Sequence, residues 1–233
     1  MKKDTGTRAD WDSSGIETEA DDWLNKGSDA YRNGEYDEAI SFYLRSIELD
    51  PAAAAYYNLG NAYYDQGNLT KAIQSYKKAI ELDPAADAYI NLGIAYGRQG
   101  NTAKAIQMFD KAIEVNPAAA DAYYNLGVAY KNQSNTAKVI QMYDKAIELK
   151  PDDADAYYNL GNAYYGQGNT VKAIKMFDKA IELKPDFAKA YNNLGVAYKN
   201  QGNTTKAIQS FEKAARLGHK GAQDWLKKKG HDW

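Results

Sequence analysis

The sequence predicts an all-α protein built from a helical hairpin that repeats along the chain. A segment of the type Tyr-Asn-Leu-Gly recurs, in a weaker form in the first copy, and its glycines are 33 or 34 residues apart, at positions 27, 60, 93, 127, 161 and 195. All five prolines recur in step with these segments, at Pro51, Pro84, Pro117, Pro151 and Pro185. Within each period the apolar residues follow helical spacing rather than the alternation of a strand. A period of this length is typical of solenoids assembled from one repeated unit.

The first half of each period predicts a helix with one apolar stripe. In the second copy, Tyr56, Leu59, Gly60 and Tyr63 lie at i, i+3, i+4 and i+7, which places them on one face. Because Gly60 has no side chain, we expect a second helix to approach the first closely at this point.

The second half of each period predicts the partner helix of a hairpin. Its facing stripe combines small and large apolar side chains: Ala72, Ile73, Tyr76, Ala79 and Ile80. The small alanines are expected to accept the large tyrosines of the first helix, as in ridge-into-groove packing. One such hairpin cannot bury both of its faces alone, so neighbouring hairpins are expected to stack and share a continuous core.

Turn signals separate these helices. The stretch Asp65-Gln66-Gly67-Asn68 predicts the turn within the second hairpin, because glycine permits backbone conformations that other residues avoid. Pro84 predicts the end of the second helix, since proline cannot continue a helix and restricts the residue before it.

These residues resemble the signature of the tetratricopeptide repeat (TPR) family, in which aromatic, Leu-Gly, alanine and proline positions recur every 34 residues. The second copy matches this signature with Tyr56, Leu59, Gly60, Tyr63, Ala72, Tyr76 and Pro84. The third and fifth copies match it in the same register. The resemblance implies a right-handed superhelical solenoid of six TPR hairpins with a C-terminal capping helix. It also implies that the first helices line a concave groove in which partner peptides bind.

The resemblance covers nearly the whole chain. Six repeats are expected, over residues 20–52, 53–85, 86–119, 120–153, 154–187 and 188–219. A capping helix is expected over 220–229, with Ala222, Trp225 and Leu226 packed on the last repeat, followed by a C-terminal tail over 230–233. Residues 1–19 are polar and lack a helical period, so we expect them to form a disordered tail.

Three repeats depart from the pattern, and the sixth does so by reading Gly218-His219 in place of the proline. The first carries Lys26 where the others carry an apolar residue, which suits an outer repeat with one side in water. The fourth carries Ser134 in place of glycine and Val139 in place of alanine. We expect the turn to accommodate Ser134 and Val139 to strain the close helix contact slightly.

Composition argues against several classes of function. The chain has no cysteine, and its two histidines, His219 and His231, both lie near the C-terminus, so we expect no metal site, no cofactor and no catalytic role. A formal net charge of −2 gives no general attraction to nucleic acid or to an acidic membrane surface. No apolar run approaches the roughly 18–20 residues that span a bilayer.

The N-terminus favours a cytoplasmic location. Its first residues include lysines but no apolar segment of the kind that signal peptides contain. A periplasmic or secreted form from which a signal peptide was removed is the alternative.

An asparagine occupies one equivalent position in all six repeats: Asn25, Asn58, Asn91, Asn125, Asn159 and Asn193. Asparagine is a poor interior helix residue, and its amide offers both a donor and an acceptor. A ladder of such amides is able to bind an extended peptide backbone, and it is similar to the asparagine array in the TPR superhelix of the eukaryotic O-linked N-acetylglucosamine transferase. The alternatives are a bond to the neighbouring repeat, or simple inheritance through duplication.

Aromatic and basic residues complete the candidate groove. Tyrosine provides a large contact area at a low entropy cost, which makes five tyrosines candidate contacts: Tyr57, Tyr64, Tyr124, Tyr158 and Tyr165. The alternative is that they pack between repeats. Lys131 and Lys199 are candidates to meet an acidic ligand, or else are solvated lysines. The lysine position of TPR modules that clamp C-terminal carboxylates is not basic in any repeat here, which argues against that type of clamp.

These observations favour a non-catalytic scaffold that binds a peptide or a segment of a partner protein in the concave groove. The sequence does not identify that partner. The alternative is a self-assembling structural unit, because an acidic N-terminal end and a basic C-terminal end could make head-to-tail contacts that do not close. In a variant of this alternative, the N-terminal tail lies in a groove with Trp11 as its anchor.

Overall fold

The structure is a computed structural model that describes the backbone of residues 13–233. Within that range it contains thirteen helices and no strand, which confirms the all-α class predicted from the sequence. The chain divides into two compact units, one ending at Met108 and the other beginning at Phe109.

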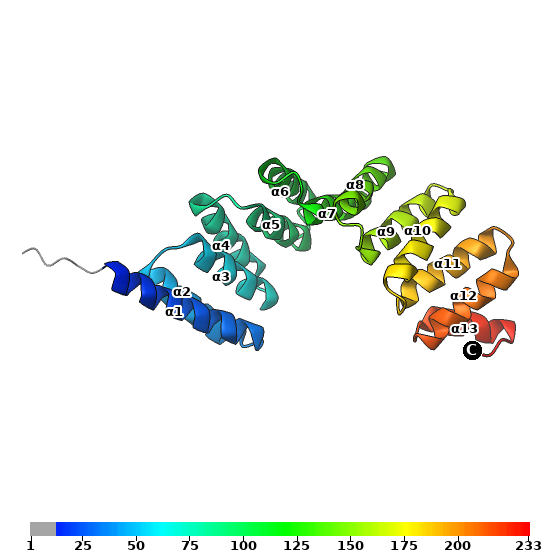
Figure 1. Ribbon diagram of the computed structural model, residues 1–233, viewed down its shortest axis with the longest axis horizontal. Helices are drawn as coiled ribbons and strands as arrows, with labels where there is room; N and C mark the ends of the chain where they lie inside the picture. The colour runs from blue at the N-terminus through cyan, green and yellow to red at the C-terminus, as the bar shows by residue number, and fades with distance from the viewer. Residues whose placement is uncertain (1–12) are drawn as a thin grey trace, which may run out of the picture. The chain divides into compact units, whose positions relative to one another are not determined.

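The first unit consists of helical hairpins that pack one on the next (Figure 1). Its helices are α1 (Ser13–Arg32), α2 (Tyr36–Leu49), α3 (Ala53–Asp65), α4 (Leu69–Leu82) and α5 (Ala86–Arg98), followed by the first half of α6 (Thr102–Val115). Helix α1 pairs with α2 and α3 with α4, while α2 contacts α3 and α4 contacts α5. The first helices of successive hairpins also touch, α1 with α3 and α3 with α5.

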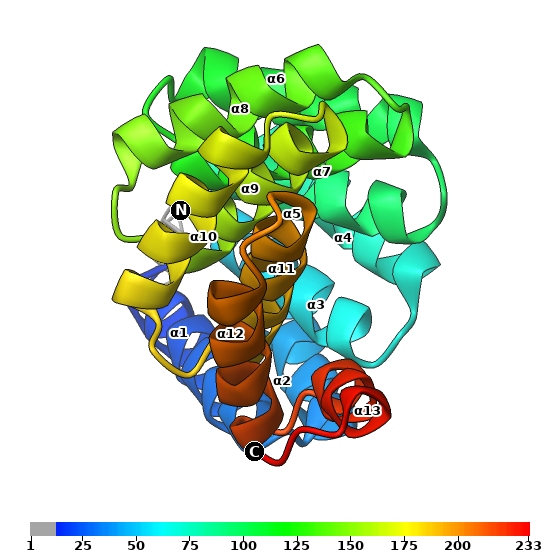
Figure 2. The ribbon, with the colours of Figure 1, turned by 90° about the vertical axis from the view of Figure 1, so that its right-hand side faces the viewer.

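The second unit repeats this arrangement after the end of α6. Its helices are α7 (Ala120–Asn132), α8 (Thr136–Leu149), α9 (Ala154–Gly166), α10 (Thr170–Leu183), α11 (Ala188–Asn200), α12 (Thr204–Arg216) and α13 (Lys220–Lys229). Each of these helices packs on the next in sequence, and α13 lies against α12 (Figure 2). Ala222 and Leu226 of α13 are fully buried, and the Trp225 ring lies 4.4 Å from that of Phe211.

The turns within the hairpins have the chemistry that the sequence predicts. Gly67 adopts a φ of +90°, in the left-handed region that favours glycine. The next residue, Asn68, caps α4, because its side-chain oxygen accepts the backbone N–H of Lys71 at 3.2 Å. Asn135, Asn169 and Asn203 cap α8, α10 and α12 in the same way.

Ser134 occupies the position of Gly67 in the fourth repeat. Its φ is +57°, so the turn keeps its left-handed conformation although the residue has a side chain. Such a conformation costs an L-residue roughly 1–2 kcal/mol. The turn accommodates Ser134 as expected, with some backbone strain.

Helix α1 begins earlier than the sequence analysis expected. It starts at Ser13, so residues 13–19 are helical rather than a disordered tail. The buried Ala20 extends the apolar stripe of α1 towards its N-terminus, and adding further turns to an existing helix costs little compared with nucleating one. Residues 1–12, including Trp11, lie outside the described residues.

Five of the hairpins are closed by an aromatic ring of the second helix that rests on a glycine of the first. A Cβ atom added to these glycines would lie only 2.5–2.8 Å from a ring carbon. The pairs are Gly27 with Tyr43, Gly60 with Tyr76, Gly127 with Tyr143, Gly161 with Phe177, and Gly195 with Phe211. All five rings are at most 3% exposed. The close approach expected at Gly60 is therefore present, and the same contact recurs in both units.

The hydroxyls on these rings have different surroundings. Tyr76 donates its hydroxyl hydrogen to Asn61 Oδ1 at 2.8 Å. The hydroxyl of Tyr143 is buried and has no hydrogen-bond partner, because the residue equivalent to Asn61 in its hairpin is Val128. A buried hydroxyl without a partner costs about 1–3 kcal/mol.

The glycine contact predicts opposite effects of two alanine substitutions in α9. Gly161→Ala should lower the free energy of unfolding by about 1–3 kcal/mol, because the new methyl group would overlap the Phe177 ring. Gly166→Ala should leave stability unchanged or raise it by up to about 1 kcal/mol, since nothing lies within 4 Å of a Cβ there. Urea unfolding followed by circular dichroism measures both. Equal effects of the two substitutions would contradict the contact.

The two tyrosine environments predict opposite effects of removing one oxygen atom. Tyr143→Phe should raise the free energy of unfolding by about 1 kcal/mol, because it removes an unsatisfied buried hydroxyl. Tyr76→Phe should lower it by about 1 kcal/mol, because the bond to Asn61 is lost. Urea unfolding of both variants is the measurement, and a loss of stability in Tyr143→Phe would show that its hydroxyl is satisfied.

Candidate functional site

The repeated asparagines lie on the first helix of each hairpin. Asn25 is on α1, Asn58 on α3 and Asn91 on α5 in the first unit; Asn125, Asn159 and Asn193 are on α7, α9 and α11 in the second. Asn25 is exposed, whereas the other five are half-buried. We call the surface that these residues mark in each unit the ladder face.

In the first unit, the asparagine amide joins neighbouring hairpins. Asn91 Nδ2 donates to the Tyr57 hydroxyl at 2.9 Å and to Asn61 Oδ1 at 3.0 Å. Both acceptors are on α3, so Asn91 holds α5 to the first helix of the preceding hairpin. Asn61 also accepts the Tyr76 hydroxyl, so one carbonyl oxygen serves two donors.

The second unit repeats this bond twice. Asn159 Nδ2 on α9 donates to the Tyr124 hydroxyl on α7 at 3.0 Å. Asn193 Nδ2 on α11 donates to the Tyr158 hydroxyl on α9 at 3.2 Å and to Asn162 Oδ1 at 2.7 Å. The alternative of a bond to the neighbouring repeat therefore holds for Asn91, Asn159 and Asn193.

The sequence explains why Asn58 and Asn125 do not make this bond to the preceding repeat. It requires a tyrosine at the equivalent position one repeat earlier, and that position holds Leu24 before Asn58 and Ile90 before Asn125. Neither residue has a hydroxyl. Asn125 Nδ2 donates instead to the backbone carbonyl of Asp121, one turn earlier in its own helix, at 2.8 Å.

Three of the five candidate tyrosines pack against other rings as well as accepting these bonds. Tyr57 lies 6.1 Å from Tyr76, Tyr124 lies 5.6 Å from Tyr143, and Tyr158 lies 4.9 Å from Phe187. Burial raises the pKa of both Tyr57 and Tyr124, with nearby aspartates adding to the shift, so both phenols stay neutral at physiological pH. These three side chains are half-buried and hold the repeats together, and they also border the ladder face.

The other two tyrosines lie near the C-terminal ends of their helices. The Arg98 guanidinium is 4.9 Å from the centre of the Tyr64 ring. The Tyr165 hydroxyl accepts a hydrogen bond from Asn200 Nδ2. Both tyrosines are half-buried, so each retains accessible ring surface.

A hollow of about 240 Å³ opens on the ladder face of the first unit. It is lined by Tyr31, Asn61, Tyr64, Asp65, Tyr76, Asn91 and Ile94. The Tyr31 hydroxyl donates a hydrogen bond to the Asp65 carboxylate. Burial is the largest cause that raises the pKa of Tyr31, and this hydrogen bond raises it further. The structure thus brings the predicted residues Asn91 and Tyr64 together around one hollow.

A hollow of about 170 Å³ opens on the ladder face of the second unit. Its lining residues come from α7, α8, α9 and the turn between α7 and α8: Lys131, Ser134, Asn135, Thr136, Val139, Asn159, Asn162, Ala163 and Gly166. Two of the predicted site residues, Lys131 and Asn159, meet here. The other predicted lysine, Lys199, is exposed near the end of α11.

Several lining residues were not among the sequence candidates, notably Tyr31, Asn61, Asp65, Asn162 and Gly166. Asn61 and Asn162 stand four residues after Tyr57 and Tyr158, one turn further along the same helices. Only the second and fifth repeats combine this tyrosine with this asparagine. That coincidence was a signal available in the sequence.

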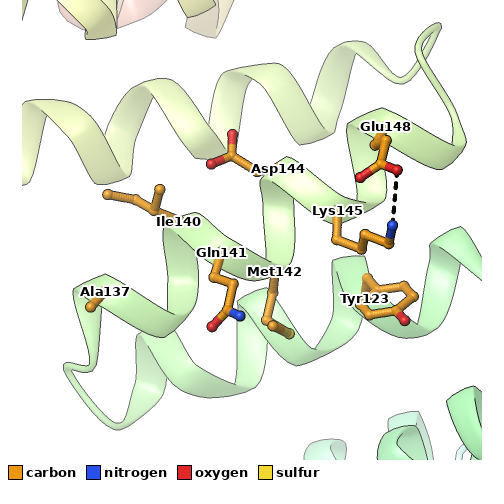
Figure 3. Close-up of a pocket in the computed structure, with 8 residues that line it drawn as sticks. All are labelled: Tyr123, Ala137, Ile140, Gln141, Met142, Asp144, Lys145 and Glu148. Carbon is orange, nitrogen blue, oxygen red and sulfur yellow. Dashed lines mark hydrogen bonds and ion pairs between the residues drawn. The ribbon is translucent and has the colours of Figure 1, made fainter.

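A larger hollow of about 610 Å³ lies over α8 in the second unit (Figure 3). Tyr123 comes from α7, and the other lining residues come from α8. Its charged groups already have partners: Lys145 pairs with Glu148 at 2.9 Å, and Asp144 is near Lys172. Burial raises the pKa of Asp144, and Lys172 opposes this shift. The equivalent ion pair recurs between Lys179 and Glu182 on α10. The ion pair therefore belongs to the repeat and does not mark a special site at this hollow.

Two kinds of feature are absent from the part of the chain that the structure describes. No group of three or more His, Cys, Asp or Glu side chains among these residues could hold a metal ion. No helix there is both long enough and apolar enough to cross a membrane.

Comparison with family models identifies repeats over most of the chain. A model described as TPR repeat matches residues 27–67, 60–100 and 138–168. Two models described as tetratricopeptide repeat match residues 86–118 and 154–187, and residues 108–141 and 176–209. Together these matches run without a gap from residue 27 to residue 209. A comparison with curated protein sequences finds no match.

Solved structures agree with the family models. A crystal structure of MamA is 34% identical, with a TM-score of 0.64, covering 71% of this chain and 97% of that one. YrrB, described as a TPR protein with an unusual peptide-binding site, is 28% identical, with a TM-score of 0.60, covering 78% and 97%. The pilF protein of Pseudomonas aeruginosa is 19% identical and shares the fold, with a TM-score of 0.80, covering 92% and 99%. The chain belongs to the tetratricopeptide repeat family.

Proposed function

We propose that this protein is a non-catalytic interaction scaffold that binds an extended peptide segment of a partner protein along the ladder face, in the concave groove of the TPR solenoid. The observation that carries the proposal is the pair of hollows on this face, one in each unit. Each hollow is lined by residues that the sequence singles out, Asn91 and Tyr64 in one and Asn159 and Lys131 in the other.

The chemistry of these hollows suits a peptide backbone. An asparagine amide offers two donors and one acceptor. Asn159 uses one donor on Tyr124, which leaves an N–H and the carbonyl oxygen for a ligand. Asn91 uses its donors on Tyr57 and Asn61, which leaves its carbonyl oxygen to accept a peptide N–H. The asparagines therefore combine a structural bond with unused hydrogen-bonding capacity.

The aromatic residues supply the contact area. Tyr64 and Tyr165 are half-buried and held in place by Arg98 and Asn200, so little side-chain entropy is lost when a ligand packs on them. YrrB is described as having a peptide-binding site, which supports the same class of ligand for this chain.

Photo-crosslinking tests the position of the binding surface. A benzophenone amino acid placed at Tyr64, or at Gly166 in the second hollow, should form adducts with partner proteins in a native lysate, identified by mass spectrometry. The matched controls are Leu82 and Val171, exposed apolar residues on the second helices α4 and α10. They should give no such adducts.

Two outcomes would contradict the proposal. Partner adducts of equal yield from all four positions would show that the ladder face is not the binding surface. Adducts only with a second copy of the chain would favour the self-assembling alternative.

A further inference from the structure

A second series of contacts joins neighbouring repeats at the C-terminal ends of their first helices. Tyr31 donates to Asp65 and the Arg98 guanidinium packs over Tyr64, both in the first unit. Tyr165 accepts from Asn200 in the second unit. In each case a polar side chain near the end of one helix reaches back to a tyrosine of the preceding repeat.

The second unit breaks this series once, between α7 and α9. The tyrosine position is occupied by Lys131, and the residue that should reach back to it is Gly166, which has no side chain. The hollow of about 170 Å³ lies at this break and is bordered by both residues. Its volume is about six times the share of one water molecule in the liquid, at roughly 30 Å³ each, so it has room for one short side chain.

The groups around this hollow define its charge. Lys131 is exposed and belongs to no ion pair within residues 13–233. No carboxylate lines the hollow, whereas the amides of Asn159 and Asn162 and the hydroxyls of Ser134 and Thr136 border it. Val139 and Ala163 add apolar surface that a short methylene stem is able to cover. The hollow therefore presents one cation and several uncharged donors, with no anion.

The hollow of the first unit has the opposite character. Asp65 contributes a carboxylate to it, and no lysine or arginine lines it. A lining with a cation and no anion is therefore specific to the hollow at Lys131 and is not shared by the hollow of the first unit.

We infer that the Lys131 hollow is a subsite for an acidic side chain, aspartate or glutamate, of the peptide bound along the ladder face. The inference rests on the proposed function and names one specificity determinant within it. The ammonium group of Lys131 pairs with the carboxylate, and the neighbouring amides and hydroxyls donate hydrogen bonds to its oxygens.

The chain contains a matched control. Lys199 occupies the position equivalent to Lys131 on α11, is also exposed, and is not among the lining residues of the hollow. Lys199→Glu and Lys131→Glu therefore change the net charge by the same amount, and only the second changes the subsite.

Selection from a random phage-displayed library of linear peptides tests the inference on the full chain. Peptides selected on the wild type should be enriched in Asp or Glu at one position of their shared motif. Selection on Lys131→Glu should lose this enrichment and favour Lys or Arg there, whereas selection on Lys199→Glu should keep it. A shared motif without an acidic position, or one unchanged by Lys131→Glu, would overturn the inference.

A selected peptide then provides a quantitative check by fluorescence anisotropy. Replacing its acidic residue by the corresponding amide should weaken binding to the wild type about three- to fivefold, as expected for a solvent-exposed ion pair. The same replacement should have no effect on binding to Lys131→Gln. An equal loss on both proteins would place the acidic residue elsewhere.

The selection also separates the two proposals. Peptides that bind but show no acidic preference would overturn the subsite and leave the peptide-binding scaffold in place. A wild type that selects no peptide above the background of an uncoated surface would overturn both.

Discussion

The structure depends on a ring resting on a glycine. In five hairpins, the aromatic side chain of the second helix occupies the space that a Cβ atom would fill on the first. This contact sets how closely the two helices approach, and therefore which faces of the hairpin remain for its neighbours. Because these five hairpins are closed in the same way, successive hairpins within each unit are able to stack in the same order.

Hydrogen bonds on the ladder face add a second level of organisation. An asparagine amide reaches the tyrosine hydroxyl of the preceding repeat wherever that tyrosine is present. Two of these asparagines, Asn91 and Asn159, also line the hollows that we propose as the ligand site. The binding that we propose relies on the hydrogen-bonding groups that these bonds leave unused, and on the positions where repeats differ, such as Lys131, Asp65 and Gly166.

Much of the fold follows from the sequence, because the repeat period, the apolar stripes of the helices and the turn residues all indicate the same helical hairpin. The role of Gly60 and the turn at Gly67 were predictable from a single period, and the family was predictable from the recurrence of that period in register along the chain. The start of α1 was not, since residues 13–19 carry no apolar stripe and only their continuity with a packed helix makes them helical. The partners of the asparagines and the hollow at Gly166 depend on which residue stands one repeat away, so they become evident only when side chains of two repeats are seen together.

The central claim is that asparagine amides join neighbouring repeats through tyrosine hydroxyls. A double-mutant cycle tests this claim, with urea unfolding of the wild type, Asn159→Ala, Tyr124→Phe and the double variant. If the bond of 3.0 Å is present, the two substitutions should be non-additive, with a coupling free energy of about 1 kcal/mol. Effects that add to within about 0.3 kcal/mol would show that the two side chains do not interact and would contradict the account.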